Sequence, residues 1–170
     1  VLFPLLQFFT HLPLIGWAKP VPVNPVHLRN PGRDQIFVSL AGPASNLVAA
    51  VASFALLALL KMTSEDAGNL VTSMAFTSNI PAQQSVLAPL VGILYFAMVI
   101  NLALALFNLL PIPPLDGHWL LYGLLPYNAS RVLERISSYG FILLYALLFL
   151  NAFRFLFIPV LWIRRVLLAI

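Results

Sequence analysis

The stretch Asn108-Leu-Leu-Pro-Ile-Pro-Pro-Leu-Asp-Gly117 decides how this chain folds, because it ends a long apolar run with an abrupt break. Each of its three prolines lacks a backbone N–H and clashes with the preceding helical turn, so we expect irregular backbone over residues 111–117. The carboxylate of Asp116 therefore follows directly on an apolar segment, where a charge is unfavourable.

The composition indicates an integral membrane protein. Hydrophobic residues make up 61% of the 170 residues and charged residues only 8%, whereas a soluble domain has roughly 45–50% apolar and 25% charged residues. The length fits one domain with three or four passes of about 20 residues each. The Lys and Arg residues lie mainly at the ends of apolar runs, which is typical of membrane-interface anchors and argues against nucleic acid as a partner.

Three segments are predicted to be membrane helices. Residues 35–60 and 86–110 are almost continuously apolar, and at 1.5 Å per residue each can cross a hydrocarbon core of about 30 Å. A third span is expected at about residues 138–150, and the apolar residues after it are expected to be either interfacial or a short fourth span. Residues 62–85 are predicted to form a polar loop. The predicted fold class is thus an all-α polytopic membrane protein.

A proline-rich segment precedes the first full span. Residues 16–34 contain four prolines, which remove backbone donors and favour extended conformations in the residues before them. We expect a small extended or β element here. The distribution of Lys and Arg places this segment and the residues after Gly117 on the cytoplasmic side, with the polar loop outside.

Asp116 is the first candidate for a functional residue. An aspartate ahead of Gly-His-Trp-Leu-Leu can be explained as a helix N-cap that accepts backbone N–H bonds. Because a proline-rich break follows a membrane span here, we favour a carboxylate that faces a cavity, as ionisable groups at membrane depth are functional-site candidates. Asn108, eight residues upstream, either bonds unpaired carbonyls at the end of its helix or orients a substrate carbonyl.

Three segments, in this order, resemble elements of the site-2 protease family of intramembrane zinc metalloproteases. Residues 16–25 are similar to the loop after the metal helix in the compact bacterial branch without a PDZ domain, and residues 41–46 to the family's Gly-Pro-x-x-Asn element. Residues 108–117 are similar to its second signature. The structural positions of the last two motifs are Gly42, Pro43, Asn46, Pro111, Pro113 and Gly117.

The resemblance implies a zinc site made by two His of a His-Glu-x-x-His helix and by the Leu-Asp-Gly aspartate, here Asp116. Two imidazoles and one carboxylate leave a fourth position for water, whose pKa the metal lowers while the glutamate acts as general base. Asn108 would orient or stabilise the scissile carbonyl. The implied reaction is hydrolysis of a peptide bond of a membrane-embedded or membrane-proximal substrate, in contact with lipid, in a bacterial inner membrane.

The sequence departs from the family pattern because it contains no His-Glu-x-x-His. It has no cysteine either, so a zinc site would need His and carboxylate ligands. His11, His27 and His118 are not followed by Glu, and no two are four residues apart; for His118 a role as a cap or as a partner of the site is favoured. We therefore interpret residues 1–170 as a single metalloprotease-like membrane domain, inactive alone, whose metal helix lies before Val1; true loss of that helix is the alternative.

Two further roles stay open at this level. The proline-rich segment is either a rigid connector or an extended edge that pairs with an unwound substrate, and its candidate substrate-binding residues are Pro20, Val21, Pro22, Val23 and Asn24. Asn46 and Asn101 are expected to make interhelical hydrogen bonds. The rival function classes are a small transporter with a discontinuous helix and a non-catalytic relative that only binds membrane segments.

Overall fold

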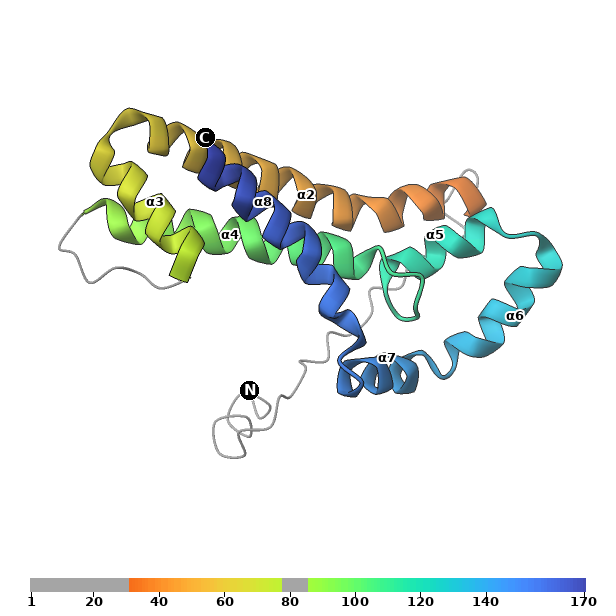
Figure 1. Cartoon of the computed structure of the whole chain (residues 1–170). Helices are drawn as coiled ribbons and strands as arrows, with labels where there is room; N and C mark the ends of the chain where they lie inside the picture. Colours follow the sequence, from red (N-terminus) through yellow and green to blue (C-terminus); the bar gives the residue numbers. More distant parts are fainter. Residues whose placement is uncertain (1–30, 78–85) are drawn as a thin grey trace, which may run out of the picture. The chain divides into compact units, whose positions relative to one another are not determined.

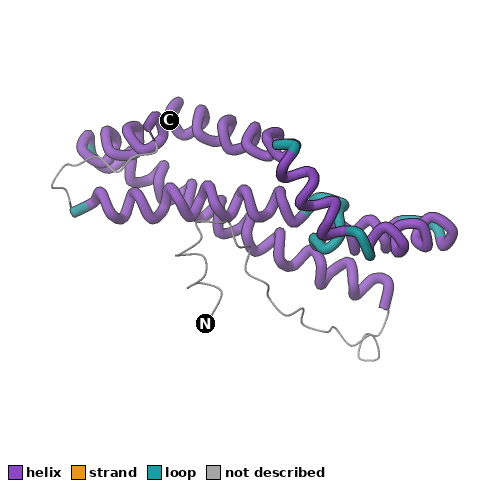
Figure 2. Tube along the Cα trace, turned by 90° about the horizontal axis from the view of Figure 1, so that it is seen from below, coloured by secondary structure: helices purple, strands orange, loops and turns teal. Residues whose placement is uncertain are grey.

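The computed structural model describes residues 31–77 and 86–170. The chain divides into two units after Pro31, and the fold described here is that of the second unit, Gly32–Ile170. Its regular structure, over the described residues, is helical without any strand (Figure 2). The elements, labelled in Figure 1, are α2 (Pro31–Thr63), α3 (Glu65–Thr77), α4 (Leu87–Asn108), α5 (Asp116–Leu124), α6 (Tyr127–Ser137), α7 (Gly140–Phe149), the 3₁₀ helix η2 (Ala152–Leu156) and α8 (Phe157–Ala169).

Two of these helices are long and apolar enough to cross a membrane. They are α2, over Arg33–Thr63, and α4, and they agree with the two long spans predicted from the sequence. The helices α6 and α7 form a third span only if they are taken together as one broken membrane segment, because the chain bends by 72° between them. Since α8 has 13 residues, it is about 20 Å long and shorter than a hydrocarbon core. The described residues therefore support two or three spans.

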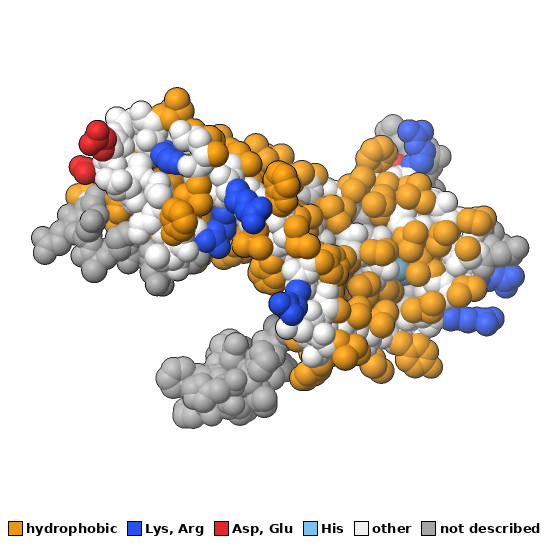
Figure 3. Space-filling view, viewed as in Figure 1, with side chains coloured by type: hydrophobic (Ala, Val, Ile, Leu, Met, Phe, Trp, Pro, Cys, Tyr) orange, Lys and Arg blue, Asp and Glu red, His pale blue; other side chains and the backbone are white. Residues whose placement is uncertain are grey.

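Hydrophobic side chains are spread over much of the face seen in Figure 3, whereas Lys and Arg lie at only a few places and Asp and Glu mainly at one end. Large apolar side chains are exposed along α2, α4, α7 and α8, among them Val48, Ile93, Phe149 and Trp162. A soluble protein rarely exposes so much contiguous apolar surface. The surface therefore supports the prediction of a membrane protein.

The larger hydrophobic core lies where α3 packs against α4 and α8, beside the C-terminal part of α2 (Figure 1). Its most deeply buried residues include Leu57, Leu70, Met74, Met98 and Leu167. The prediction of a polar loop is wrong for residues 65–77, because they form α3. The buried side chains of α3 follow the spacing of one helix face, at Ala67, Leu70, Val71, Met74 and Ala75.

Two basic side chains hold α8 in place at this core. Lys61 Nζ donates hydrogen bonds to the carbonyl oxygens of Leu167 and Leu168, at 2.9 and 3.0 Å. Arg164 donates to the carbonyl oxygens of Ala75 and Phe76 at the end of α3. The last carbonyls of a helix have no partner within it, so a cation there is favourable.

These contacts place the end of α8 beside the end of α2 and beside α3. Arg164 and its neighbour Arg165 therefore lie on the same side of the membrane as α3. The distribution of basic residues predicted that this side, which holds residues 62–85, is the outside. The two arginines count against that predicted orientation, because basic residues favour the cytoplasmic side.

Candidate functional site

The break after α4 has the irregular backbone that the prolines predict. The helix ends at Asn108, and the chain then makes a series of tight turns, in which Ile112 N donates to Leu110 O and Leu115 N to Ile112 O, both at 2.8 Å. The Pro113–Pro114 peptide is cis. The helix α4 ends two residues before the predicted position 110, and a new helix, α5, begins already at Asp116, so the irregular stretch is residues 109–115 instead of 111–117.

Gly117 allows the first turn of α5 to lie against the end of α4. A β-carbon at this position would overlap with the carbonyl oxygens of Leu109 and Leu110. Any other residue would therefore push α5 away from α4, together with the carboxylate that precedes it. This geometry explains in physical terms why glycine follows the aspartate.

The carboxylate of Asp116 lies against α2. A β-carbon placed on Gly42 would be 3.1 Å from Oδ2 of Asp116, closer than ordinary van der Waals contact. Glycine at position 42 thus makes room for the carboxylate, and two motifs far apart in the sequence meet here. Asp116 is partly buried, and this burial raises the pKa of its carboxyl group.

The alternative role of Asp116 as a helix N-cap is not supported by the geometry. The capping residue of α5 is Leu115, and this helix start has no side-chain cap hydrogen bond. The position at the start of the helix still favours a negative charge, because helix N-termini carry a partial positive charge. The carboxylate is therefore oriented towards α2 and not back onto its own helix.

The three asparagines near the break differ in their surroundings. Asn101 donates from Nδ2 to Ala97 O of its own helix, at 2.8 Å, and not to another helix as predicted, because the carbonyl four residues earlier lies within reach. Asn108 is half-buried at the last residue of α4. Asn46 is also half-buried, and it follows Gly42 by four residues, so both positions are on the same face of α2. Asn46 is thus the side-chain amide closest along the sequence to Gly42, and Asn108 the one closest to Asp116.

His118 is directed away from the carboxylate. Its Nε2 is 2.9 Å from Oγ of Ser137 in α6, and its ring also lies near those of Trp119 and Tyr122. Residues two apart in a helix point about 200° apart, which agrees with Asp116 facing α2 while His118 faces α6. Burial lowers the pKa of the His118 ring. This supports the interpretation of His118 as a partner within the site and not as a ligand beside Asp116.

An apolar groove of about 250 Å³ runs between α2 and α4, beside the Gly42 segment. It is lined by aliphatic side chains from both helices and by the proline that follows Gly42. The main contributors are Leu40, Pro43, Leu47, Leu102, Leu106 and Leu109.

The other predicted site residues lie outside the described part of the chain. They are His11 and His27, together with the candidate substrate-binding residues Pro20, Val21, Pro22, Val23 and Asn24 and the extended element they were expected to form. Within residues 31–77 and 86–170, no three His, Asp or Glu side chains are grouped so as to hold a metal ion. Asp116 by itself does not make a zinc site, and its role as a metal ligand stays a prediction.

Comparison with known proteins agrees with the resemblance stated above. The model of peptidase family M50 matches residues 9–150. The chain is 37% identical over 127 residues to a Bacillus subtilis (strain 168) protein described as "Putative zinc metalloprotease YwhC"; the alignment covers 75% of this chain and 51% of that protein. The chain thus spans about half the length of this relative. No solved structure matches the chain described here.

The fold and the site together define a helical membrane protein with a lone carboxylate at a proline break between two apolar segments. The family match extends over more than half of the chain and includes both Gly42 and Asp116. The chain belongs to the site-2 protease family, peptidase family M50.

Proposed function

We propose that the full-length protein is an intramembrane zinc metalloprotease, and that this chain contributes the aspartate side of its active site. The observation that carries the proposal is the meeting of Asp116 with Gly42, because it brings two family motifs together around one carboxylate. The substrate would be a peptide segment in or beside the membrane. The location that fits best is a bacterial inner membrane.

Zinc would supply an activated water and polarise the peptide carbonyl. Since the described residues offer only Asp116, the remaining ligands would have to come from another part of the full-length protein. The chain alone is therefore expected to be inactive. A relative that lacks those ligands would only bind membrane segments, and this is the alternative to a protease.

The other residues of this chain would bind and orient the substrate. Asn108 ends α4 eight residues before Asp116, and a side-chain amide can donate to a carbonyl or to an oxyanion. Gly117 would keep α5, and with it the carboxylate, close to α4. Residues 20–24 remain candidates for pairing with an unwound substrate strand.

A cleavage assay tests this proposal. The full-length protein, reconstituted in lipid vesicles with a tagged single-span polypeptide, should release a tagged fragment, and 1,10-phenanthroline should stop the release. Asp116→Asn should abolish cleavage, because it keeps the shape of the side chain and removes its charge. Asp66→Asn is the matched control, since Asp66 is an exposed carboxylate in the first turn of α3. Undiminished cleavage by Asp116→Asn would contradict the proposal.

A further inference from the structure

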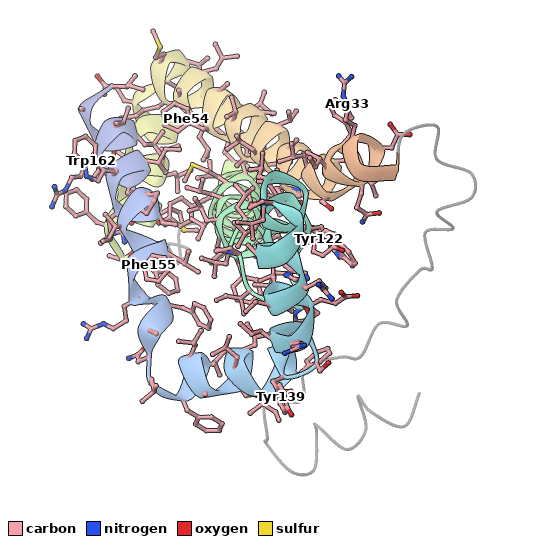
Figure 4. The ribbon with its side chains drawn as sticks, turned by 90° about the vertical axis from the view of Figure 1, so that its right-hand side faces the viewer. Arg33, Phe54, Tyr122, Tyr139, Phe155 and Trp162 are labelled. Carbon is pink, nitrogen blue, oxygen red and sulfur yellow. The ribbon has the colours of Figure 1, made fainter. Side chains whose placement is uncertain are left out.

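The junction between α6 and α7 touches the Asp116 segment on both sides. Ser137, the last residue of α6, bonds His118, two residues after the aspartate. Gly140, the first residue of α7, packs on Pro113, three residues before it. The junction can be found in Figure 4 by Tyr139, whose side chain is exposed.

The contact of Gly140 with Pro113 is too close for any side chain. A β-carbon at position 140 would be 2.5 Å from the carbonyl oxygen of Pro113 and 2.6 Å from its β-carbon. Gly140 is also the one buried residue of α7, whose apolar side chains are otherwise exposed or partly exposed. The start of α7 is therefore anchored on the proline loop.

The contact of Ser137 with His118 has a defined direction. The single hydroxyl proton of Ser137 goes to the carbonyl oxygen of Leu133, at 2.9 Å. The oxygen of Ser137 must then accept the bond from Nε2–H of His118. The buried Nδ1 of His118 has no hydrogen-bond partner among the described residues, so the bond to Ser137 is the hydrogen bond that holds the ring.

The buried residues of α5 support the importance of this contact. They are Gly117, which lies against the end of α4, and His118, which faces α6. The short helix that begins with Asp116 is thus held at two adjacent residues, one on each neighbouring helix. Loss of the Ser137 contact would remove the attachment of α5 on the side of α6.

We propose that the α6–α7 junction is a brace that sets the position of the Asp116 carboxylate, with Ser137 and Gly140 as positioning residues. Its consequence for peptide hydrolysis rests on the proposed function, but the brace itself does not. Ser137 fixes the first turn of α5 through His118, and Gly140 fixes the proline loop through Pro113. Asp116 lies between these two contacts and faces Gly42.

Disulfide trapping measures this position without zinc and without activity. Because residues 1–170 contain no cysteine, the pair Gly42→Cys and Asp116→Cys can be introduced into the full-length protein, with any cysteine elsewhere replaced. A β-carbon at position 42 would lie 3.1 Å from Oδ2 of Asp116, and cysteine at 116 vacates the space of that oxygen, so we expect this pair to be able to form a disulfide. The rate of disulfide formation with copper phenanthroline, below the unfolding temperature of every variant, then reports how closely residue 116 faces α2.

The brace predicts a specific pattern of rates. Ser137→Ala and Gly140→Ala should each slow disulfide formation several-fold, and Ser137→Thr, which keeps the hydroxyl, should restore the rate. Ser138→Ala is the matched control at an exposed neighbour and should leave the rate unchanged. Equal rates in all backgrounds would overturn the proposal, and so would equal slowing by Ser138→Ala. A failed cleavage assay would contradict the protease function and leave this result standing.

Discussion

At the scale of single residues, glycines determine where the carboxylate lies. Gly42 leaves the space that Oδ2 of Asp116 occupies, Gly117 lets α5 approach α4, and Gly140 lets α7 approach Pro113. In each case a β-carbon would meet an atom of the site segment or of the helix end beside it. The glycines are required by close approach, and not by an unusual backbone conformation, since no glycine among the described residues has a positive φ.

Gly42→Ala should separate stability from metal binding. Alanine in a helix is favoured over glycine by about 1 kcal/mol, so the unfolding temperature of the full-length protein should stay the same or rise. The added β-carbon would displace Oδ2 of Asp116, so zinc affinity should fall. Gly123→Ala is the control, because Gly123 is an exposed glycine of α5 and its replacement should leave zinc affinity unchanged. Unchanged zinc affinity in Gly42→Ala would show that the carboxylate does not depend on this space.

At the scale of helices, the caps made by Lys61 and Arg164 join α8 to α2 and α3. Both bonds connect residues far apart in the sequence and satisfy carbonyls that a helix end leaves free. The smaller helices α3 and α8 are thus attached by charge as well as by apolar packing.

Lys61→Met should lower the free energy of unfolding by about 1–2 kcal/mol, because methionine keeps the apolar stem and loses the cap on α8. Thermal unfolding in detergent measures this loss. Arg165→Met, at an exposed neighbour of Arg164, should change the unfolding temperature little. If the two variants unfold at the same temperature, the cap does not contribute to stability.

The helices were predictable from the sequence to different degrees. The spans α2 and α4 followed from continuous hydropathy, and the break after Asn108 followed from its prolines. The helix α3 was missed because Glu65, Asp66 and Asn69 mask a buried face, although its apolar residues have helical spacing. The meeting of Gly42 with Asp116 and the bond from His118 to Ser137 depend on packing between distant segments, which local patterns do not encode.

At the scale of the whole molecule, the described unit is a helical membrane protein with the carboxylate of Asp116 at its proline break. Its helices provide two or three spans. The carboxylate of Asp116 lies between Gly42 of α2 and the proposed brace formed by α6 and α7. The chain belongs to the site-2 protease family, and it spans about half the length of its Bacillus relative.

The most direct test of this account is the zinc content and zinc affinity of the purified full-length protein with Asp116→Ala, compared with wild type and with Asp66→Ala. The account predicts bound zinc in wild type and in Asp66→Ala, and an affinity about tenfold or more lower in Asp116→Ala, since even residues that only support a metal ligand have effects of this size. Equal zinc content and affinity in all three proteins would remove Asp116 from the metal site and contradict the account.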